Sequence, residues 1–408
     1  MRTTRPVRFA IAAHACSTWG SFLNMVALGL FTLDLTGSTV QTGLFMAVRL
    51  TAGFLMGPMA GVLVARYPRR SLMITADLLS AAALVLLVVA PAGAQPVVLY
   101  GLAVVVGAGQ TLWGVALRSG MPELVRPERL ARANAHLVAA RSTAMLLGFG
   151  TSGLVVTLLG YHTAFLLDAA SYVLSALLLT RVGAWRSAAV PHSRATDRPR
   201  RPALRHALSG VAPVVLAMVA VRTLDAFGSA SHNVGLPVYA TLTRPDAPAS
   251  FAAVFTAAWA VGSLSVSRLL ARRPAPTSPA AFGFATCAMS VLFVLAFTGP
   301  AMWLLVVVVV AAGMADGYAE ISYTTRLQNV EPSRRAHLFG LAGACQNAGF
   351  GIGMIISAFA LEHLAPFAVI AAAHGLALAA AAAFLATRLR PPDRRPHRPV
   401  AQKVEAAP

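Results

Sequence analysis

The chain has 408 residues, of which 57% are hydrophobic and only 12% are charged. A soluble domain is about 25% charged, so this composition argues against a soluble enzyme, a disordered chain or a secreted disulfide scaffold. The net charge of +19 could indicate a nucleic-acid partner, but the arginines fall in short gaps between apolar runs, so we expect none. The three cysteines lack the spacing of a metal site, and we expect no metal and no cofactor.

Long apolar runs follow one another along almost the whole chain. About 20 apolar residues in a helix cross the ~30 Å hydrocarbon layer of a bilayer, and continuous rather than alternating runs favour helices over a barrel. Twelve runs reach this length: 9–33, 40–64, 71–90, 96–116, 134–159, 163–183, 207–239, 251–270, 280–298, 301–325, 338–361 and 367–389. We therefore predict an all-α polytopic membrane protein with twelve transmembrane helices in the lipid bilayer.

The basic residues predict how these helices are oriented. If the N-terminus is cytoplasmic and the runs alternate, 29 of the 33 lysines and arginines lie on the cytoplasmic side, and the external loops hold only Arg244. Cytoplasmic loops of membrane proteins carry such an excess of positive charge. We predict a multi-pass protein of the plasma membrane with both termini in the cytoplasm.

The longest gap between runs divides the chain into two halves. It is rich in arginine, proline and serine, as expected of a flexible linker. The predicted organisation is a six-helix bundle at 1–183, a cytoplasmic linker at 184–206, a second six-helix bundle at 207–390 and a disordered cytoplasmic tail at 391–408.

Glycines recur in the two halves at one offset. Gly61 and Gly262 are 201 residues apart, and so are Gly148 and Gly349. Parallel repeats related by an axis along the membrane normal are one known transporter architecture. The offset therefore predicts two repeats of six helices.

Two segments resemble one transporter family. Gly61, Leu63, Arg66, Arg69 and Arg70 match the loop G-x-L-x-D-R-x-G-R-R of the major facilitator superfamily, with Ala65 and Pro68 at the aspartate and second glycine positions. The segment from Met121-Pro-Glu-Leu to Ala133-Asn134-Ala135, with Phe165-Leu-Leu-Asp168, resembles its branch of enterobactin-type siderophore exporters and macrolide efflux pumps.

The resemblance implies a twelve-helix fold and alternating-access transport, usually export driven by proton antiport. It also implies that the loop after the second run gates the cavity. The gating residues would be Gly61, Arg66, Arg69 and Arg70.

Ionisable residues inside the runs are the candidate functional groups, because charge is costly at membrane depth. Asp316 and Glu320 have i, i+4 spacing and share a helix face. Two carboxylates so placed resist joint ionisation, so one should hold a proton near neutral pH. The resemblance puts this helix at the central cavity, and we predict that the pair couples transport to protons. The alternative is that Glu320 pairs with a loop arginine.

The run 207–239 carries a second charged pair and a segment rich in small residues. Arg222 and Asp225 either neutralise each other or form a cavity pair, and Asp225 is the reserve candidate for proton coupling. The segment that ends at Pro237 should break or kink the helix, which makes His232 and Asn233 candidate substrate contacts. For His232 a purely structural role is the alternative.

Arg49 lies too deep in its run to reach the surface easily and needs an acceptor or an anionic substrate group; Asp34 is one possible partner. Trp19 and Trp113 are candidate cavity walls for a bulky amphipathic ligand.

Three further charges have a predicted structural role. The resemblance implies that two of them lie in helices that flank the cavity, and the third lies about two turns into its helix; pairing within the protein is the usual fate of such charges. These residues are Asp77, Arg141 and Asp168, and Asp77 could meet one of the loop arginines.

Together these observations predict a secondary active transporter and not an enzyme. The favoured function is proton-coupled export of an amphipathic small molecule, such as a drug, siderophore or secondary metabolite, by a monomer. No P-loop is present to supply ATP energy. The alternatives are an importer or uniporter of the same fold, or a non-transporting membrane sensor.

Overall fold

The computed structural model of the protein describes residues 5–183, 185, 210–273 and 277–389. Most of the predicted linker and all of the predicted tail lie outside these residues. Trp185, the one described residue within the predicted linker, is buried and its indole Nε1 donates a hydrogen bond to Gly120 O at 3.2 Å.

Helices make up nearly all of the described chain, and eleven of them are long and apolar enough to cross a membrane. The first half contains α1 (Arg5–Thr36), α2 (Thr39–Arg66), α3 (Arg69–Val89), α4 (Gln95–Leu124), the short η1 (Pro127–Arg129) and α5 (Leu130–Thr180). The second half contains α7 (Pro213–Thr243), α8 (Pro248–Arg272), α9 (Pro279–Ala296), α10 (Met302–Gln328), α11 (Pro332–Leu361) and α12 (Pro366–Leu389). The protein is a multi-pass membrane protein.

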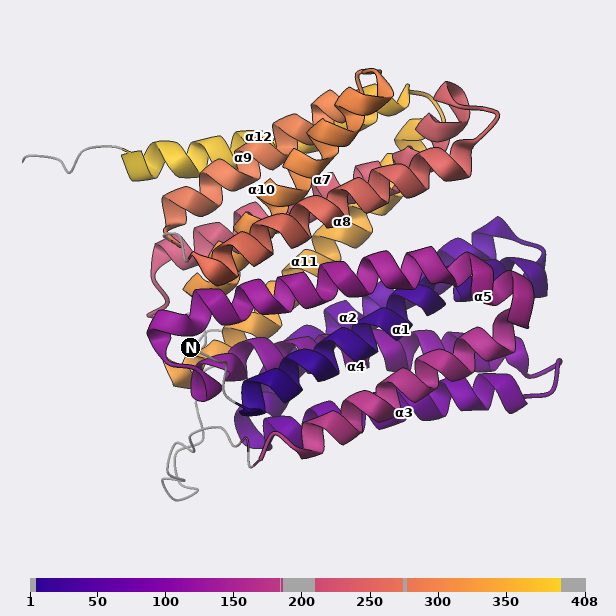
Figure 1. The fold of residues 1–408 in the computed structure, drawn as a ribbon, viewed down its shortest axis with the longest axis horizontal. Helices are drawn as coiled ribbons and strands as arrows, with labels where there is room; N and C mark the ends of the chain where they lie inside the picture. Colours follow the sequence, from indigo (N-terminus) through magenta and orange to yellow (C-terminus); the bar gives the residue numbers. More distant parts are fainter. Residues whose placement is uncertain (1–4, 184, 186–209, 274–276, 390–408) are drawn as a thin grey trace, which may run out of the picture.

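The element α5 contains two of the predicted runs. A straight helix of its 51 residues would be roughly 77 Å long, more than twice the hydrocarbon thickness. Its backbone is non-helical at Gly160, where φ is 78°, a conformation that glycine adopts readily. Gly148 packs against Trp19 and Phe22 of α1, and Gly20 of α1 packs against Ser171. Both limbs of α5 therefore meet the same turn of α1, and the chain reverses direction at Gly160 (Figure 1).

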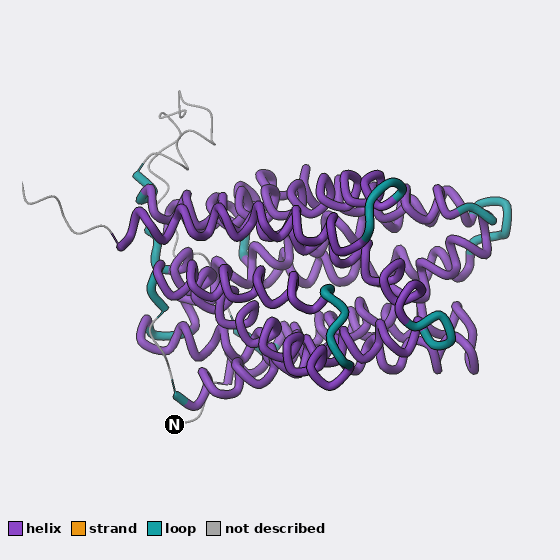
Figure 2. The backbone as a smooth tube through the Cα atoms, turned by 90° about the horizontal axis from the view of Figure 1, so that it is seen from above, coloured by secondary structure: helices purple, strands orange, loops and turns teal. Residues whose placement is uncertain are grey.

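The helices form two bundles, α1–α5 and α7–α12, and run along a common direction (Figures 1 and 2). Because successive helices alternate in direction, the exposed side chains of Arg66, Arg126, Arg272 and Arg388 gather at one end, which we call the basic end. The opposite, far end carries Arg244 in the loop between α7 and α8. This gathering of positive charge is the pattern that the sequence predicted.

The bundles are joined through their basic-end halves. A Cβ atom added to Gly57 of α2 would lie 2.6 Å from Gly340 O of α11, so only glycines allow this approach. Asn134 of α5 donates hydrogen bonds to Thr325 Oγ1 at 2.8 Å and to Gln328 Oε1 at 2.7 Å, both on α10. One apolar core here combines residues of both bundles, whereas toward the far end each bundle has its own core. The bundles diverge toward the far end (Figure 1).

Only one of the two glycine pairs that suggested a repeat has matching surroundings. Gly148 packs on α1 and Gly349 packs on Thr223 of α7, so each meets the first helix of its own bundle. Gly61 packs on His337 of α11, in the other bundle, whereas Gly262 packs on α10 of its own bundle. Gly61 and Gly262 therefore have the spacing of a repeat, but they do not contact corresponding helices.

Candidate functional site

A cavity of about 540 Å³ lies between the two bundles. Its walls combine aromatic side chains with charges at membrane depth, a mixture suited to an amphipathic ligand. The aromatic residues are Phe22, Trp113, Tyr172, Tyr323 and Phe339. The charged residues are Arg49, Asp77, Arg118, Arg141, Arg222, Asp316 and Glu320.

Arg222 of α7 is the centre of a charge cluster in the second bundle. Its Nη1 lies 2.5 Å from Asp225 Oδ2 and 3.4 Å from Asp316 Oδ1, and its Nη2 lies 2.9 Å from Glu320 Oε2. The i, i+3 spacing on α7 and the i, i+4 spacing on α10 bring the three carboxylates to one guanidinium. The structure thus unites all three predicted coupling candidates with Arg222.

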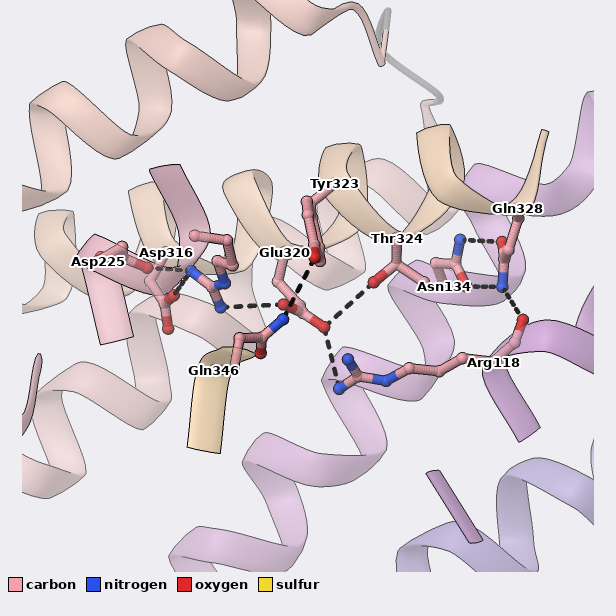
Figure 3. A network of polar contacts seen from close by, with 10 residues as sticks. Arg118, Asn134, Asp225, Asp316, Glu320, Tyr323, Thr324, Gln328 and Gln346 are labelled. Carbon is pink, nitrogen blue, oxygen red and sulfur yellow. Dashed lines mark hydrogen bonds and ion pairs between the residues drawn. The ribbon is translucent and has the colours of Figure 1, made fainter. Parts of the chain in front are cut away.

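Glu320 also extends this cluster to the first bundle. Its Oε1 lies 3.1 Å from Arg118 Nη2 of α4 and accepts a hydrogen bond from Thr324 Oγ1 at 3.2 Å (Figure 3). Gln328, two turns further along α10, donates to the Arg118 backbone oxygen at 2.9 Å. Glu320 therefore ties α10 to the opposite bundle.

Arg118 corrects one prediction and bears on another. Arg118 follows the predicted run 96–116 and was therefore expected among the basic residues of a cytoplasmic segment, but it lies within α4 and lines the cavity. The alternative for Glu320, pairing with an arginine near the basic end, is realised by this helix residue rather than by a loop residue.

Arg141 does not have the structural pairing that was predicted for it. Its side chain is exposed to the cavity, and its guanidinium carbon lies 5.8 Å from the centre of the Phe22 ring. It makes no ion pair with any residue that the structure describes. An arginine over an aromatic face is attracted by the ring, and Asp316 and Glu320 act on Arg141 electrostatically without forming an ion pair with it.

Arg49 is held by neutral groups. Its Nη2 donates to Gln110 Oε1 at 2.9 Å, and Gln110 Nε2 donates in turn to Ser21 Oγ at 3.1 Å. The proposed pairing with Asp34 is wrong, because Asp34 accepts a hydrogen bond from Tyr161 Oη at 2.5 Å near the far end. Arg49 and Arg141 are thus two cavity cations without a carboxylate partner among the described residues.

The two intramembrane carboxylates of the first bundle are also held by neutral donors. Asp77 Oδ2 accepts from Ser175 Oγ at 2.7 Å and from Trp113 Nε1 at 3.3 Å. Asp168 Oδ2 accepts from Asn24 Nδ2 at 2.7 Å, and its Oδ1 accepts from Ser171 Oγ at 3.3 Å. The prediction that these carboxylates form structural charge pairs, with Asp77 next to a loop arginine, is therefore wrong.

The loop between α2 and α3 is anchored by an acid that the sequence analysis missed. Buried Arg69 forms an ion pair with Glu123 of α4, and Arg70 Nη1 donates to Gly183 O at 3.1 Å, whereas Arg66 is exposed. The signal was present, since Glu123 follows the fourth apolar run at the same end as the loop arginines.

Three predicted contacts lie apart from the cavity lining. His232 is buried, with Nδ1 3.1 Å from His374 Nε2 and its ring stacked on Phe293. Asn233 Nδ2 donates to Ser229 O at 2.8 Å, and Trp19 lines a separate depression formed by α1, α5 and α8. Of the break or kink expected near Pro237, a break is excluded, because α7 continues to Thr243.

Trp113 does line the cavity. Its ring stacks on the His14 ring, with the two ring centres 5.3 Å apart. Within the described ranges, no group of three or more histidine, cysteine, aspartate or glutamate side chains could hold a metal ion.

Solved structures of other proteins share the fold of this chain. Similar solved structures include a bacterial homologue of the iron transporter ferroportin in an outward-facing state, at a TM-score of 0.75 and 16% identity, covering 95% of this chain and 100% of that one. The human organic anion transporter MFSD10 (TETRAN) is similar at a TM-score of 0.72 and 13% identity, covering 93% and 99% of the two chains. No curated protein matches the sequence.

The sequence itself matches a family model. That model, the Major Facilitator Superfamily, covers residues 10–330, which is well over half of the chain. The chain belongs to the Major Facilitator Superfamily.

Proposed function

We propose that the protein is a secondary active transporter that exports an amphipathic small molecule across the plasma membrane in exchange for protons. The observation that carries the proposal is the charged cavity between two bundles that are joined through their basic-end halves. In this proposal the basic end is cytoplasmic, the two limbs of α5 are separate spans, and twelve helices form two six-helix repeats.

Alternating access would require the contacts at the basic end to separate. Those contacts are the ion pair between Glu320 and Arg118, the hydrogen bonds of Asn134 to α10 and the glycine contact between α2 and α11. All of them join rigid helices, so rocking one bundle against the other would break them together. The arrangement described here would then be the state in which an exporter releases substrate outward and takes up a proton.

The composition of the cavity supports an amphipathic substrate with an anionic group. Aromatic rings offer apolar contact, while Arg49 and Arg141 have no carboxylate partner among the described residues and could hold a carboxylate or phosphate. Motifs similar to those of siderophore and macrolide exporters favour export of a drug, siderophore or secondary metabolite.

Flux measurements in proteoliposomes with an imposed pH gradient test this function. A fluorescent amphipathic anion should accumulate against its own gradient when protons flow the other way. Transport that is independent of the pH gradient would favour a uniporter, and accumulation in the direction of proton flow would favour an importer. Binding without flux would favour a sensor.

A reversible cross-link tests alternating access. Cysteines at Asn134 and Gln328, in a background without the three native cysteines, should let a short, reducible bifunctional thiol reagent join the bundles at the basic end, because the two native side chains meet there through their amide ends. The reagent should stop transport and a reductant should restore it, whereas a single cysteine at Asn134 should respond to neither. Full transport by the cross-linked protein would argue against rocking of the bundles.

A further inference from the structure

In the second bundle Asp225, Asp316 and Glu320 contact arginine, whereas Asp77 and Asp168 of the first bundle form no ion pair with any described residue, and a carboxylate without a cation binds a proton more readily. We propose that Asp77 and Asp168 of the first bundle form a proton-binding site that serves the transport cycle, rather than Asp316 and Glu320 of the second. The inference rests on the proposed proton coupling and names the residues that carry it.

Asp77 has the position that such a site requires. It lies on α3 and contributes to the cavity wall, yet its side chain is almost fully buried. Its hydrogen bonds come from a serine hydroxyl and an indole N–H, which supply no countercharge. An ionised carboxylate without a cation is unfavourable in this setting, whereas the protonated acid is neutral.

Asp168 has the same kind of surroundings and an additional feature. Asn24 donates its amide N–H to Asp168, but the Asn24 amide oxygen is buried and has no hydrogen-bond partner among the described residues. A protonated carboxyl group has one O–H to donate, and a side-chain amide can pair with it through one donor and one acceptor. The unsatisfied oxygen therefore points to an acid that carries a proton.

The charged and titratable groups nearest the pair supply no ion pair to it. Arg49 of α2 is the cation that acts on Asp168, but it donates to Gln110 and forms no ion pair with Asp168. On α4, Arg118 pairs with Glu320 instead. The nearby titratable groups of α1 are His14 and Cys16, and Tyr172 lies on α5 with Asp168. His14 stacks on Trp113, which in turn bonds Asp77. Among the described residues, neither carboxylate has an ion pair.

The second bundle offers the opposite environment. Asp225, Asp316 and Glu320 all contact Arg222, and Glu320 also contacts Arg118. A guanidinium next to a carboxylate favours the charged form of both groups. These ion pairs join α7, α10 and α4, and Glu320, with two arginine partners, is the carboxylate whose charged form they favour most.

In the proposed cycle, the carboxyl group of Asp77 takes up one proton from the cavity and later releases it. A hydronium ion in the cavity transfers its proton to a carboxylate oxygen of Asp77, which forms one O–H bond and releases water. After the bundles rock, the same O–H bond breaks toward water at the basic end. Asp168, which interacts electrostatically with Asp77, makes joint ionisation unfavourable and so promotes uptake of the proton.

Infrared difference spectroscopy on the reconstituted protein tests the site directly. Protonated carboxyl groups have a carbonyl stretch distinct from that of carboxylates, and a pH step should change it in the wild type. The double variant Asp77→Asn, Asp168→Asn should lose this change. Glu320→Gln is the control, since Glu320 is held by Arg118 and Arg222, and this variant should keep the signal.

Flux measurements separate this inference from the proposed function. The double variant should lose uphill, pH-driven accumulation of the fluorescent anion and retain downhill exchange, because an amide keeps the shape but binds no proton. If wild-type flux ignores the pH gradient, the proposed coupling fails whatever the spectra show. If the double variant still couples flux to protons, or keeps the infrared signal, the site is elsewhere and the proposed function stands.

Discussion

The two bundles treat buried carboxylates in opposite ways. In the second, Asp225, Asp316 and Glu320 converge on Arg222, and Glu320 reaches Arg118 across the cavity. In the first, Asp77 and Asp168 are bound by hydroxyl, indole and amide donors. The ion pairs of the second bundle hold α7, α10 and α4 together, and they would separate when the bundles move apart. A carboxyl group without a cation can instead bind and release a proton. The difference suggests that one bundle carries the gate and the other carries the proton.

Removing the central cation should produce the largest effect. Arg222→Gln would leave three carboxylates together without their common partner, and breaking a buried ion pair from one side typically costs about 3–5 kcal/mol. We expect a large loss of folded protein, measured as thermal unfolding in detergent. Arg244→Gln, at the far end, should have no measurable effect. Equal stability of the two variants would contradict the account of the cluster.

The first bundle also has one arginine–carboxylate pair, between Arg69 and Glu123 at the loop after α2. Removing it should destabilise the protein as removing a pair in the second bundle does. Arg69→Ala would leave Glu123 without its partner, and since this acid is partly exposed we expect a loss of about 2–3 kcal/mol, below the buried limit. Arg70→Ala removes one hydrogen bond, worth about 1 kcal/mol. Arg66→Ala should change stability by less than about 0.5 kcal/mol. Thermal unfolding of the three variants should follow this order, and a larger effect at exposed Arg66 would contradict it.

The contact between the bundles should control the balance of conformations. Arg118→Ala removes the partner of Glu320 in the opposite bundle. If the state with a closed basic end loses about 1.4 kcal/mol of stability, the ratio of closed to open protein falls tenfold. A cysteine at Thr325, buried at the basic end, should therefore react faster with a thiol reagent. Thr324→Val removes a hydrogen bond to the same glutamate from within α10, and its labelling rate should stay close to that of the parent. Equal rates in both variants would show that the ion pair does not hold the end closed.

The fold could be predicted from the sequence because hydrophobic length and arginine placement are local properties. The apolar runs correspond to the helices, although α5 joins two of them through Gly160. The i, i+4 spacing of Asp316 and Glu320 correctly put both on one face, since helix geometry fixes it.

Partners across helices were harder to predict. Arg118 was assigned to a loop, Arg49 was matched to Asp34, and Asp77 was expected near the loop arginines, because a single sequence does not state which helix faces meet. The neutral donors around Asp168 come from α1 and from its own helix, and no spacing rule connects Asn24 with Asp168. His232 and Asn233 were expected at the cavity and do not line it, for the same reason, whereas Arg49, Arg222 and Trp113 do.

The smallest expected effect is the sharpest test of the contrast between the bundles. If Asp77 and Asp168 are neutral in the folded protein, then Asp77→Asn and Asp168→Asn replace a neutral acid by a neutral amide of the same shape. The unfolding free energy at neutral pH should change by no more than about 0.5 kcal/mol, because no charge loses a partner. Asp225→Asn has the same burial and the same change in atoms, yet it removes a carboxylate that touches Arg222, so it should destabilise by about 1.5–3 kcal/mol. Thermal unfolding of the three variants in one buffer compares them directly. If Asp77→Asn costs as much as Asp225→Asn, the first-bundle acid is charged and held by interactions that an amide cannot replace, and the division between the bundles would not hold.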